Sequence, residues 1–499
     1  MVFSSQLFVF CFLPLALCVY YALPARGRQA ALTILSYIFY GWSNPAFLLL
    51  LMFSTVLDYT GGLVISQNGL RWPSLPPRQL DSATKQSRLQ RWTLIACMTG
   101  NLCLLGFFKY FNFAVDNYNA LLAALGFAGL RFDDVLRVTL PLGISFYTFQ
   151  TMSYTIDVYR GKACAIRNFV DFACFVSMFP QLVAGPIVRF TDVSDQLRHR
   201  SHTLERFARG AAMFSVGMAK KILLANPCGK VADTVFSAGS ITSFDAWYGV
   251  VAYSFQIYFD FSAYSDMAIG LGLMFGFVFP KNFDSPYRSE SITEFWRRWH
   301  ISLSTWLRDY LFLPVSYAIL RRVQGDRVLR FFKTESFAYT SATMLTMFLG
   351  GLWHGAAWHF VLWGAMHGVW LAIDRMALKR SAYRRVPRPF RVGITFLLVM
   401  ISWVFFRADS IAHAAQYCMR MVGAGECGPG AVMVGGIIHN PYYLSTLIIA
   451  AAVTWTCPQT WDWTRNLSWQ KALLSIILLS LSLGIMTTQA YNPFIYFIF

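Results

Sequence analysis

Residues 350–368 read GGLWHGAAWHFVLWGAMHG, a run as apolar as a membrane helix that nevertheless contains three histidines. Basic residues flank the wider segment on both sides, namely Arg330, Lys333, Arg375 and Lys379. Because basic loops are retained on the cytoplasmic side of a membrane, a chain flanked in this way must enter and return. We therefore expect two helices of about 18 residues within residues 337–373. They should meet at a break over residues 350–355, where glycines permit backbone angles that other residues resist.

The composition of the chain is that of a membrane protein. Of its 499 residues, 56% are hydrophobic, 17% aromatic and only 13% charged, which is too little polar surface to coat a soluble particle of this size. Several runs approach or exceed the roughly 20 apolar residues that span a bilayer, namely residues 45–65, 92–115, 247–279, 392–406 and 471–488. We predict an all-α polytopic membrane protein with about 10 to 12 transmembrane helices, together with re-entrant and interfacial helices.

The net charge of +18 is carried largely by short loops between the apolar runs. These loops are residues 71–91, 160–167, 189–209, 281–298, 321–333 and 375–391. Retention of positive loops in the cytoplasm accounts for them, so the charge does not indicate binding to nucleic acid. The apolar N-terminal run lacks a positively charged leader, and we interpret it as a retained helix, not a signal peptide.

We interpret residues 1–499 as a single membrane-embedded domain. Residues 68–91 are the predicted cytoplasmic linker, and residues 408–440 are a polar linker expected on the opposite side. Residues 169–188 carry two prolines and a glycine between basic loops, which predicts a broken or re-entrant segment. The ten cysteines include no Cys-x-x-Cys pair, so we expect neither a metal site nor a disulfide framework.

Ionisable side chains inside the apolar runs are few, and such residues are functional candidates because they are costly to place in a membrane. They are Asp157, Arg189, Asp260, Asp266, His300, His354, His359 and His367. His354 has the strongest local case, because a histidine can serve as a general base near neutral pH and the adjacent glycines leave space for a substrate. A core histidine that binds a backbone carbonyl at the turn explains the same local pattern equally well.

Helical geometry separates the three histidines of residues 350–368. His359 and His367 follow His354 by five and thirteen positions, which rotates them by about 140° and 220° on a helix. A three-histidine metal site on one helix is therefore not expected, and we assign structural roles to His359 and His367. Asp260 and Asp266 are about 240° apart by the same rule, so each is expected to pair with an arginine or to cap a helix.

His300 lies in residues 291–316, which read SITEFWRRWHISLSTWLRDYLFLPVS. Ser291 or Thr293 can cap a helix whose first turn contains Glu294, and the pattern predicts an interfacial amphipathic helix. Its aromatic and cationic residues are Trp296, Arg297, Arg298, Trp299 and Arg308. Membrane anchoring alone explains these residues. The functional alternative is that they bind an anionic donor, such as a phosphate-bearing coenzyme, while His300 points inward.

Six stretches, in order along the chain, carry a resemblance to a known family. They are LPLGISFYTFQTMSYTIDVYRG (140–161), FPQLVAGPIVR (179–189), YFDFSAYSDMAIGLGLMFG (258–276), FWRRWHISLSTWLRDYLFLP (295–314), GGLWHGAAWHFVLWGAMHG (350–368) and ISWVFFRADS (401–410). The chain resembles the membrane-bound O-acyltransferases, specifically their bacterial alginate O-acetyltransferase branch. The combination is highly specific and covers nearly the whole chain.

The resemblance implies a fold with a central tunnel and a catalytic region over residues 286–373. It implies that His354, in the GLWHG motif, is the catalytic histidine and that His300 is the second residue of the site. Acetyl-CoA is the implied donor, entering from the cytoplasm at the bacterial inner membrane. A periplasmic partner protein or a secreted polysaccharide is the implied acceptor.

One departure from the family pattern concerns which polysaccharide is acetylated. After LRDYL the sequence reads FLPVSYAILRR, where alginate-type members often have a Gly-rich PLGGN turn. The expected acceptor is therefore alginate, cellulose or another secreted glycan. The sequence has no G-x-S-x-G elbow, so acyl transfer would use histidine as a base with direct attack by the acceptor, or a nucleophile on a partner. The alternative function is a membrane conduit or transporter for a polysaccharide or its precursor, whose path the intramembrane polar residues would line.

Overall fold

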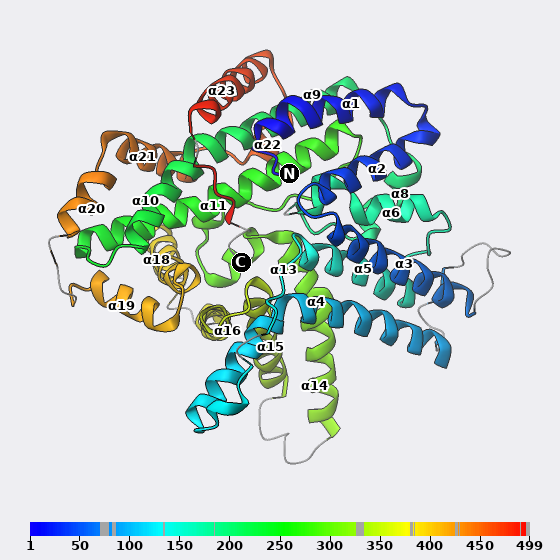
Figure 1. Ribbon diagram of the computed structural model, residues 1–499, viewed down its shortest axis with the longest axis horizontal. Helices are drawn as coiled ribbons and strands as arrows, with labels where there is room; N and C mark the ends of the chain where they lie inside the picture. The colour runs from blue at the N-terminus through cyan, green and yellow to red at the C-terminus, as the bar shows by residue number, and fades with distance from the viewer. Residues whose placement is uncertain are drawn as a thin grey trace. The chain divides into compact units, whose positions relative to one another are not determined.

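The computed structural model describes residues 1–69, 79–81, 86–132, 135–183, 185–325, 334–379, 383, 385–424, 428, 430–489 and 491–495. Every regular element in this part of the chain is a helix (Figure 1), which confirms the predicted all-α fold. Of the predicted linker at residues 68–91, residues 70–78 and 82–85 lie outside the described residues.

Among the described residues, four helices are long and apolar enough to cross a membrane. They are α3 (Ala46–Gln67), α4 (Arg88–Ala124), α18 (Arg388–Arg407) and α23 (Trp469–Thr488). The pair α20 (Gly430–Ile438) and α21 (Pro441–Thr456) is bent by 62° and would add a fifth span if it crosses as one. The polytopic membrane character is confirmed. The sequence analysis expected about 10 to 12 crossings. Three further helices, α11 (Ser243–Met274), α15 (Thr334–His354) and α16 (Trp358–Lys379), are long enough to cross but do not meet the same test of composition.

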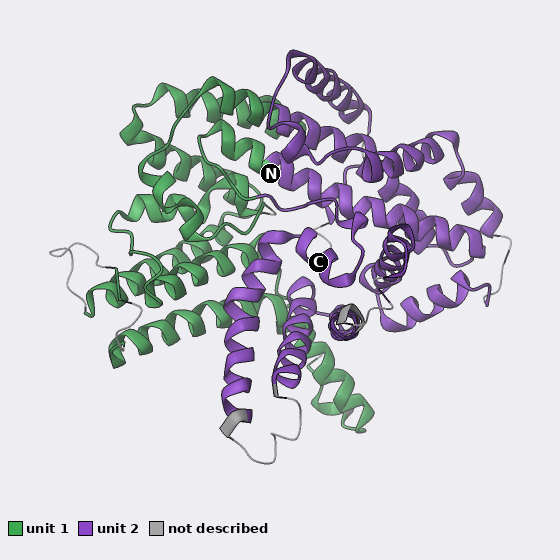
Figure 2. Cartoon of the chain, turned by 180° about the vertical axis from the view of Figure 1, so that it is seen from behind, with its two compact units in different colours: residues 1–211, 268–280 green, residues 212–267, 281–499 purple. Residues whose placement is uncertain are grey.

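The chain forms two compact units, shown in different colours in Figure 2. Unit 1 consists of Met1–Ala211 and Ala268–Pro280. Besides α3 and α4 it contains η1 (Leu7–Phe12), α1 (Leu13–Ala22), η2 (Ala25–Gly27), α2 (Arg28–Gly41), η3 (Ala128–Leu130), α5 (Ile144–Tyr159), α6 (Phe169–Ser177), α7 (Phe179–Leu182) and α8 (Phe190–Arg198). The broken segment predicted at residues 169–188 is confirmed, since α6 ends at Ser177 and only the four-residue α7 follows before Arg189.

A buried polar cluster joins three helices of unit 1. Asp58 of α3 is completely buried and accepts hydrogen bonds from Asn101 of α4 (2.7 Å) and Thr155 of α5 (2.7 Å). A buried carboxyl group is tolerated when its hydrogen bonds are made, as they are here. Asp58 was not among the functional candidates from the sequence, although it is an ionisable residue in an apolar run, as those candidates are.

Unit 2 consists of Ala212–Met267 and Lys281–Phe499. Besides α18, α20, α21 and α23 it contains η4 (Lys220–Ala225), α10 (Asn226–Phe236), η5 (Pro286–Arg288), α12 (Ile292–Arg298), α13 (Ile301–Leu307), η6 (Arg308–Phe312), α14 (Leu313–Gly325), α15 (Thr334–His354), α16 (Trp358–Lys379), α19 (Ile411–Met421) and α22 (Thr460–Trp463). Two helices, α9 (Leu204–Ala219) and α11 (Ser243–Met274), contribute residues to both units.

Helices α15 and α16 form the pair expected within residues 337–373, but the break between them is shorter than predicted. Helix α15 continues through Gly350 and Gly351 to His354, and only residues 355–357 separate it from α16. The glycines serve a different purpose. A Cβ atom at Gly351 would collide with the Phe360 carbonyl oxygen of α16, and one at Gly364 would collide with the Met347 carbonyl oxygen of α15. They permit close helix packing, which holds His354 against α16.

The segment of residues 291–316 is also broken, where one amphipathic helix was predicted. Ser291 caps α12 by accepting from the Glu294 amide (3.2 Å), as expected of the capping pattern. The helix ends at Arg298, and α13 begins at Ile301. Between them His300 adopts a left-handed conformation with φ of 42°, a strained backbone for a residue with a side chain. Strain of this kind persists only where surrounding contacts impose it.

Candidate active site

His354 is the last residue of α15 and lines two cavities of unit 2. The larger cavity has a volume of about 490 Å³, and its lining includes Trp296, Arg297, Arg308, His354 and Trp363. Arg297 is exposed and the Arg308 side chain is 59% exposed, whereas Trp363 is 1% exposed. The larger cavity therefore extends from a cationic rim to the buried ring of Trp363 beside His354.

The smaller cavity has a volume of about 10 Å³, close to that of a single water-sized sphere. Its lining is almost entirely aromatic and aliphatic, and comprises Ile257, Phe261, Trp299, His354, Trp363, Trp403, Phe406 and Ile495. His354 and Trp363 are common to both cavities. A group that reaches His354 through the larger cavity thus arrives at the wall of the smaller one.

Aromatic rings surround the His354 imidazole. The ring centroids of Trp353, Trp363 and Phe406 lie 5.0, 5.1 and 5.3 Å from that of His354, each nearly perpendicular to it. Such edge-to-face contacts fix the orientation of a ring while leaving its nitrogen atoms in the ring plane for other partners.

His300 is completely buried, and Asn282 determines its protonation. The Asn282 side-chain oxygen accepts from the Ser302 amide (3.1 Å) and the Ser302 hydroxyl (2.8 Å). A backbone amide can only donate, so the atom that faces it must be the oxygen Oδ1. The same oxygen lies 3.2 Å from His300 Nδ1. Nδ1 must therefore carry a proton, which leaves Nε2 of neutral His300 as an acceptor.

The second ring nitrogen of His300 is available for a partner, since Nε2 makes no hydrogen bond to any residue that the structure describes. His300 lies in the break between two seven-residue helices, outside the helices of spanning length. Burial lowers the pKa of His300 well below its usual value, and positive charge on His354 lowers it further. His300 is therefore neutral at neutral pH, with a lone pair on Nε2.

Both histidines contact the ring of Trp353. The Trp353 ring centroid is 6.3 Å from that of His300 and 5.0 Å from that of His354. The electrostatic effect of His354 on His300 agrees with this proximity. Two segments that are more than fifty positions apart in sequence thus bring their histidines to one site.

The family model for the membrane-bound O-acyltransferase family matches residues 142–408, which include both histidines. The chain belongs to the membrane-bound O-acyltransferase family. A probable alginate O-acetylase AlgI of Azotobacter vinelandii is 48% identical over 85% of this chain and 79% of its own length. Another of Pseudomonas putida is 42% identical over 100% of both chains. A peptidoglycan O-acetyltransferase of Helicobacter pylori is 34% identical over 85% of this chain and 80% of its own length.

Membership of this family makes the chain a membrane-embedded O-acyltransferase, as the resemblance implied, and favours the enzyme over the conduit. The relatives include acetyltransferases named for alginate and for peptidoglycan. Among the described residues, no group of three or more His, Cys, Asp or Glu is arranged to hold a metal ion.

The residues predicted to bind the donor of this O-acyltransferase divide into three groups. Trp296, Arg297 and Arg308 line the larger cavity. Trp299 is only 3% exposed and lines the smaller cavity, so it is part of the core and not the interfacial anchor that the sequence suggested. Arg298 lines neither cavity.

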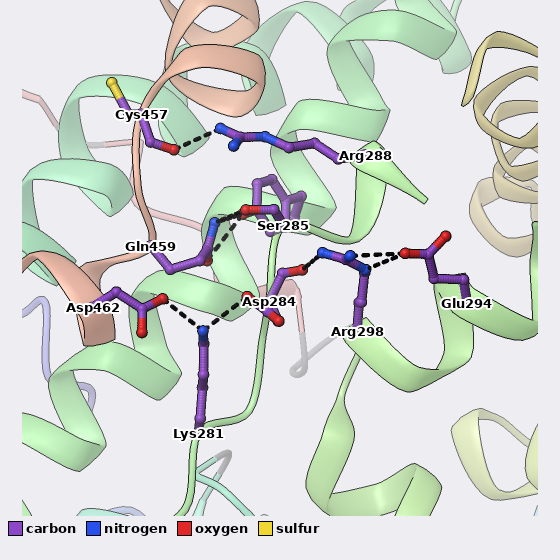
Figure 3. A network of polar contacts seen from close by, with 10 residues as sticks. Lys281, Asp284, Ser285, Arg288, Glu294, Arg298, Cys457, Gln459 and Asp462 are labelled. Carbon is purple, nitrogen blue, oxygen red and sulfur yellow. Dashed lines mark hydrogen bonds and ion pairs between the residues drawn. The ribbon is translucent and has the colours of Figure 1, made fainter. Parts of the chain in front are cut away.

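Arg298 takes part in a polar network of unit 2 (Figure 3). Its guanidinium forms an ion pair with Glu294 (2.7 Å) and donates to the Asp284 carbonyl oxygen (3.1 Å). In the same network Lys281 pairs with Asp284 (2.8 Å) and Asp462 (2.7 Å). These contacts hold the chain on both sides of Asn282, and so support the residue that orients His300.

His359 and His367 have structural partners. His359 Nδ1 is 3.1 Å from the Phe405 carbonyl oxygen, to which it must donate. His367 Nδ1 accepts from the Trp296 indole (3.3 Å), so its other nitrogen donates to the Ser402 hydroxyl (3.1 Å). Both rings are thus fixed by hydrogen bonds within unit 2.

Asp260 and Asp266 pair with lysines, where the sequence analysis expected arginines or helix caps. Asp266 forms an ion pair with Lys220 (2.8 Å), and Asp260 forms one with Lys221 (2.6 Å). The two lysines lie in the apolar run MAKKILLA at residues 218–225. A lysine within an apolar run is a functional candidate by the same rule as the other ionisable residues, and the sequence analysis did not select these two. Asn282 and Ile495 gave no comparable signal, because neither residue type is unusual in its local context.

Proposed function

We propose that this O-acyltransferase transfers an acetyl group from cytoplasmic acetyl-CoA, across the bacterial inner membrane, to a hydroxyl group of a secreted polysaccharide. The proposal rests on one observation above all. His354 lines both a large cavity with a cationic rim and a small apolar cavity of about 10 Å³. The first suits a phosphate-bearing donor, and the second suits an acyl group no larger than acetyl.

Donor binding is assigned to the larger cavity. Arg297 and Arg308 would meet the phosphate groups of coenzyme A, because guanidinium groups bind phosphate with charge-assisted hydrogen bonds. The mostly apolar lining between this rim and His354 would accommodate the extended thiol arm. The thioester carbonyl would then lie beside His354.

The reaction follows from the chemistry of the two histidines. His354 removes the proton from the acceptor hydroxyl as its oxygen attacks the thioester carbonyl carbon. The C–O bond forms, the C–S bond breaks, and the thiolate leaves with the proton that His354 returns. The products are the O-acetyl ester and free coenzyme A. His300, neutral and with a lone pair on Nε2, is assigned to orient the acceptor by accepting a hydrogen bond from a second hydroxyl group of the sugar, while His354 takes the proton of the attacking hydroxyl.

The acceptor is assigned to the opposite side of the membrane. The proposed acceptor is alginate, cellulose or a similar exopolysaccharide, and a polysaccharide acceptor is supported by the names of relatives, which include alginate and peptidoglycan acetyltransferases. A periplasmic acceptor or acetyltransferase partner would carry the group onward if the polymer does not enter the site itself.

The decisive experiment compares His354→Ala with His359→Gln in inside-out membrane vesicles supplied with acetyl-CoA labelled in the acetyl group. We expect His354→Ala to reduce label in the polysaccharide by about 100- to 10,000-fold, the usual contribution of general-base catalysis. His359→Gln removes a histidine of the same hairpin that has a structural partner, and should retain transfer. Normal transfer by His354→Ala, at normal protein levels, would refute the assignment.

A further inference from the structure

The C-terminal segment, residues 491–495, lies within the core of unit 2. Phe494 and Ile495 are 3% and 2% exposed. The Phe494 ring stacks on Tyr264 of α11 with a centroid distance of 4.5 Å. The Ile495 amide donates to Asp260 of the same helix (2.9 Å). This segment is therefore an integral part of the fold around the site.

A buried ion pair positions the segment. Lys221 and Asp260 form this pair with side chains only 3% and 1% exposed. Lys221 also donates to the Pro493 carbonyl oxygen, and the Asn226 side chain donates to the Tyr491 carbonyl oxygen (3.3 Å). A buried ion pair contributes little net stability compared with apolar packing, but it fixes its hydrogen-bonded partners in one register. Here the partner is the backbone of residues 491–495.

The position of residues 491–495 brings Ile495 to the same cavity as His354. Ile495 lines the smaller cavity, together with His354 and Trp363. The cavity volume is about 10 Å³, which corresponds to about one water-sized sphere and is close to what a methyl group needs. Most of the remaining wall consists of rings of aromatic residues that pack against one another, whereas Ile495 is an aliphatic side chain on a terminal segment.

We propose that Ile495 closes the acyl chamber of this enzyme and restricts the donor to acetyl thioesters. The proposal deepens the function proposed above and rests on it. When the thioester lies at His354, the acetyl methyl group enters the smaller cavity and meets Ile495. A propionyl group carries one more methylene, which the cavity cannot accept without displacing the wall.

The proposal predicts a measurable selectivity. One methylene in a hydrophobic pocket changes the ratio of specificity constants by about 10- to 200-fold. Shortening Ile495 to alanine removes three carbon atoms from the wall and creates space for a propionyl group. The selectivity for acetyl over propionyl should then fall by about 10-fold or more.

The experiment uses inside-out membrane vesicles from the source bacterium. In each strain the natural gene is replaced by one that encodes a single variant of the full chain. The vesicles receive acetyl-CoA or propionyl-CoA with label in the acyl group, and label in the polysaccharide is measured. Ile495→Ala is compared with Ile438→Ala, since Ile438 is also buried (0% exposed) but lies outside both cavities. We expect the propionyl-to-acetyl ratio to rise in Ile495→Ala and to remain at the natural value in Ile438→Ala.

The ratio compares two donors in the same preparation, so a lower amount of folded variant does not change it. Ile495→Val is a smaller change and should give an intermediate propionyl-to-acetyl ratio. If Ile495→Ala does not accumulate in the membrane, the ratio of Ile495→Val tests the proposal instead. Acetyl transfer with an unchanged ratio in the Ile495 variants would overturn this proposal alone. Absence of transfer from either donor by the natural enzyme would overturn the proposed function and this inference with it.

Discussion

The Oδ1 atom of Asn282 accepts a hydrogen bond from Nδ1 of His300, at a distance of 3.2 Å. The backbone amide of Ser302 donates to the same oxygen (3.1 Å). The oxygen and nitrogen of the Asn282 side chain therefore cannot exchange places, because the nitrogen could not accept this hydrogen bond. A residue outside the family's histidine motifs thus determines which nitrogen of His300 carries the lone pair. A second contact helps to hold His300 in its left-handed backbone conformation, since the Ile301 amide donates to the backbone carbonyl oxygen of Asn282 (2.9 Å).

Replacing Asn282 with alanine should lower acyl transfer by about 10- to 100-fold, equivalent to about 1.4 to 2.7 kcal/mol of activation free energy. The reason is that His300 loses the acceptor that keeps its proton on Nδ1. The measurement is the rate of label transfer from acetyl-CoA at matched protein levels. Gln459→Ala provides the control, because Gln459 is a buried amide that hydrogen-bonds to Tyr258 and Ser285 and does not contact His300.

Asn282→Asp distinguishes positioning of His300 from general support of the fold. A carboxylate keeps the acceptor for Nδ1, so activity should exceed that of Asn282→Ala. Its negative charge also raises the pKa of His300, which should move the acidic limb of the rate profile to higher pH. Equal activity in both variants, with no change in the profile, would contradict the role assigned to Asn282.

Substitution of the rim arginines should weaken donor binding with little effect on the chemical step. Arg297→Gln and Arg308→Gln are each expected to raise the KM for acetyl-CoA about tenfold, since a hydrogen bond to a charged group contributes about 1.5 to 3 kcal/mol. Arg298→Gln is the matched control. Arg298 pairs with Glu294 (2.7 Å), much as Arg308 pairs with Asp309 (2.7 Å), but Arg298 lines neither cavity. A similar rise in KM for all three variants would exclude specific donor binding at the rim.

The burial of neutral His300 predicts a loss of stability in acid. Its pKa is lowered well below 6.5 in the folded protein. Below pH 6.5 the unfolded chain binds a proton at this position that the folded protein does not, so the free energy of unfolding decreases as the pH falls. Each pH unit in this range costs about 1.4 kcal/mol.

Melting temperatures in detergent at pH 7.5 and pH 5.5 test this prediction. His300→Asn removes the titrating group, so the variant should lose less stability than the natural protein between the two values. His359 and His367 are present in both proteins, so the difference isolates His300. Equal losses in the two proteins would show that His300 does not contribute.

The sequence predicted the fold class, and it singled out His300 and His354 as ionisable rings in apolar runs, whereas their assignment to one site came from the family resemblance. Apolar length indicates spanning helices, and an ionisable ring in an apolar run indicates a site. It did not predict Asn282 or Ile495. Their roles arise from contacts between segments distant in sequence, and an asparagine in a loop or an isoleucine near the C-terminus is locally unremarkable. The break at residues 350–355 was misplaced for a related reason, since glycines that serve helix packing look the same in sequence as glycines that serve a turn.

The glycines of the α15–α16 hairpin provide the last prediction. Gly364→Ala should destabilise the enzyme by about 1 to 3 kcal/mol, because the new Cβ collides with the Met347 carbonyl oxygen and forces the helices apart. The displacement also moves His354 relative to Trp363, so acyl transfer should fall more than the amount of folded protein. Gly350→Ala is the matched control, since its Cβ would meet only Leu307 at 3.7 Å, an ordinary contact. Alanine is a better helix former than glycine by about 1 kcal/mol, so Gly350→Ala should keep or raise the melting temperature. Equal destabilisation by both substitutions would show that close helix packing at Gly364 does not position the site.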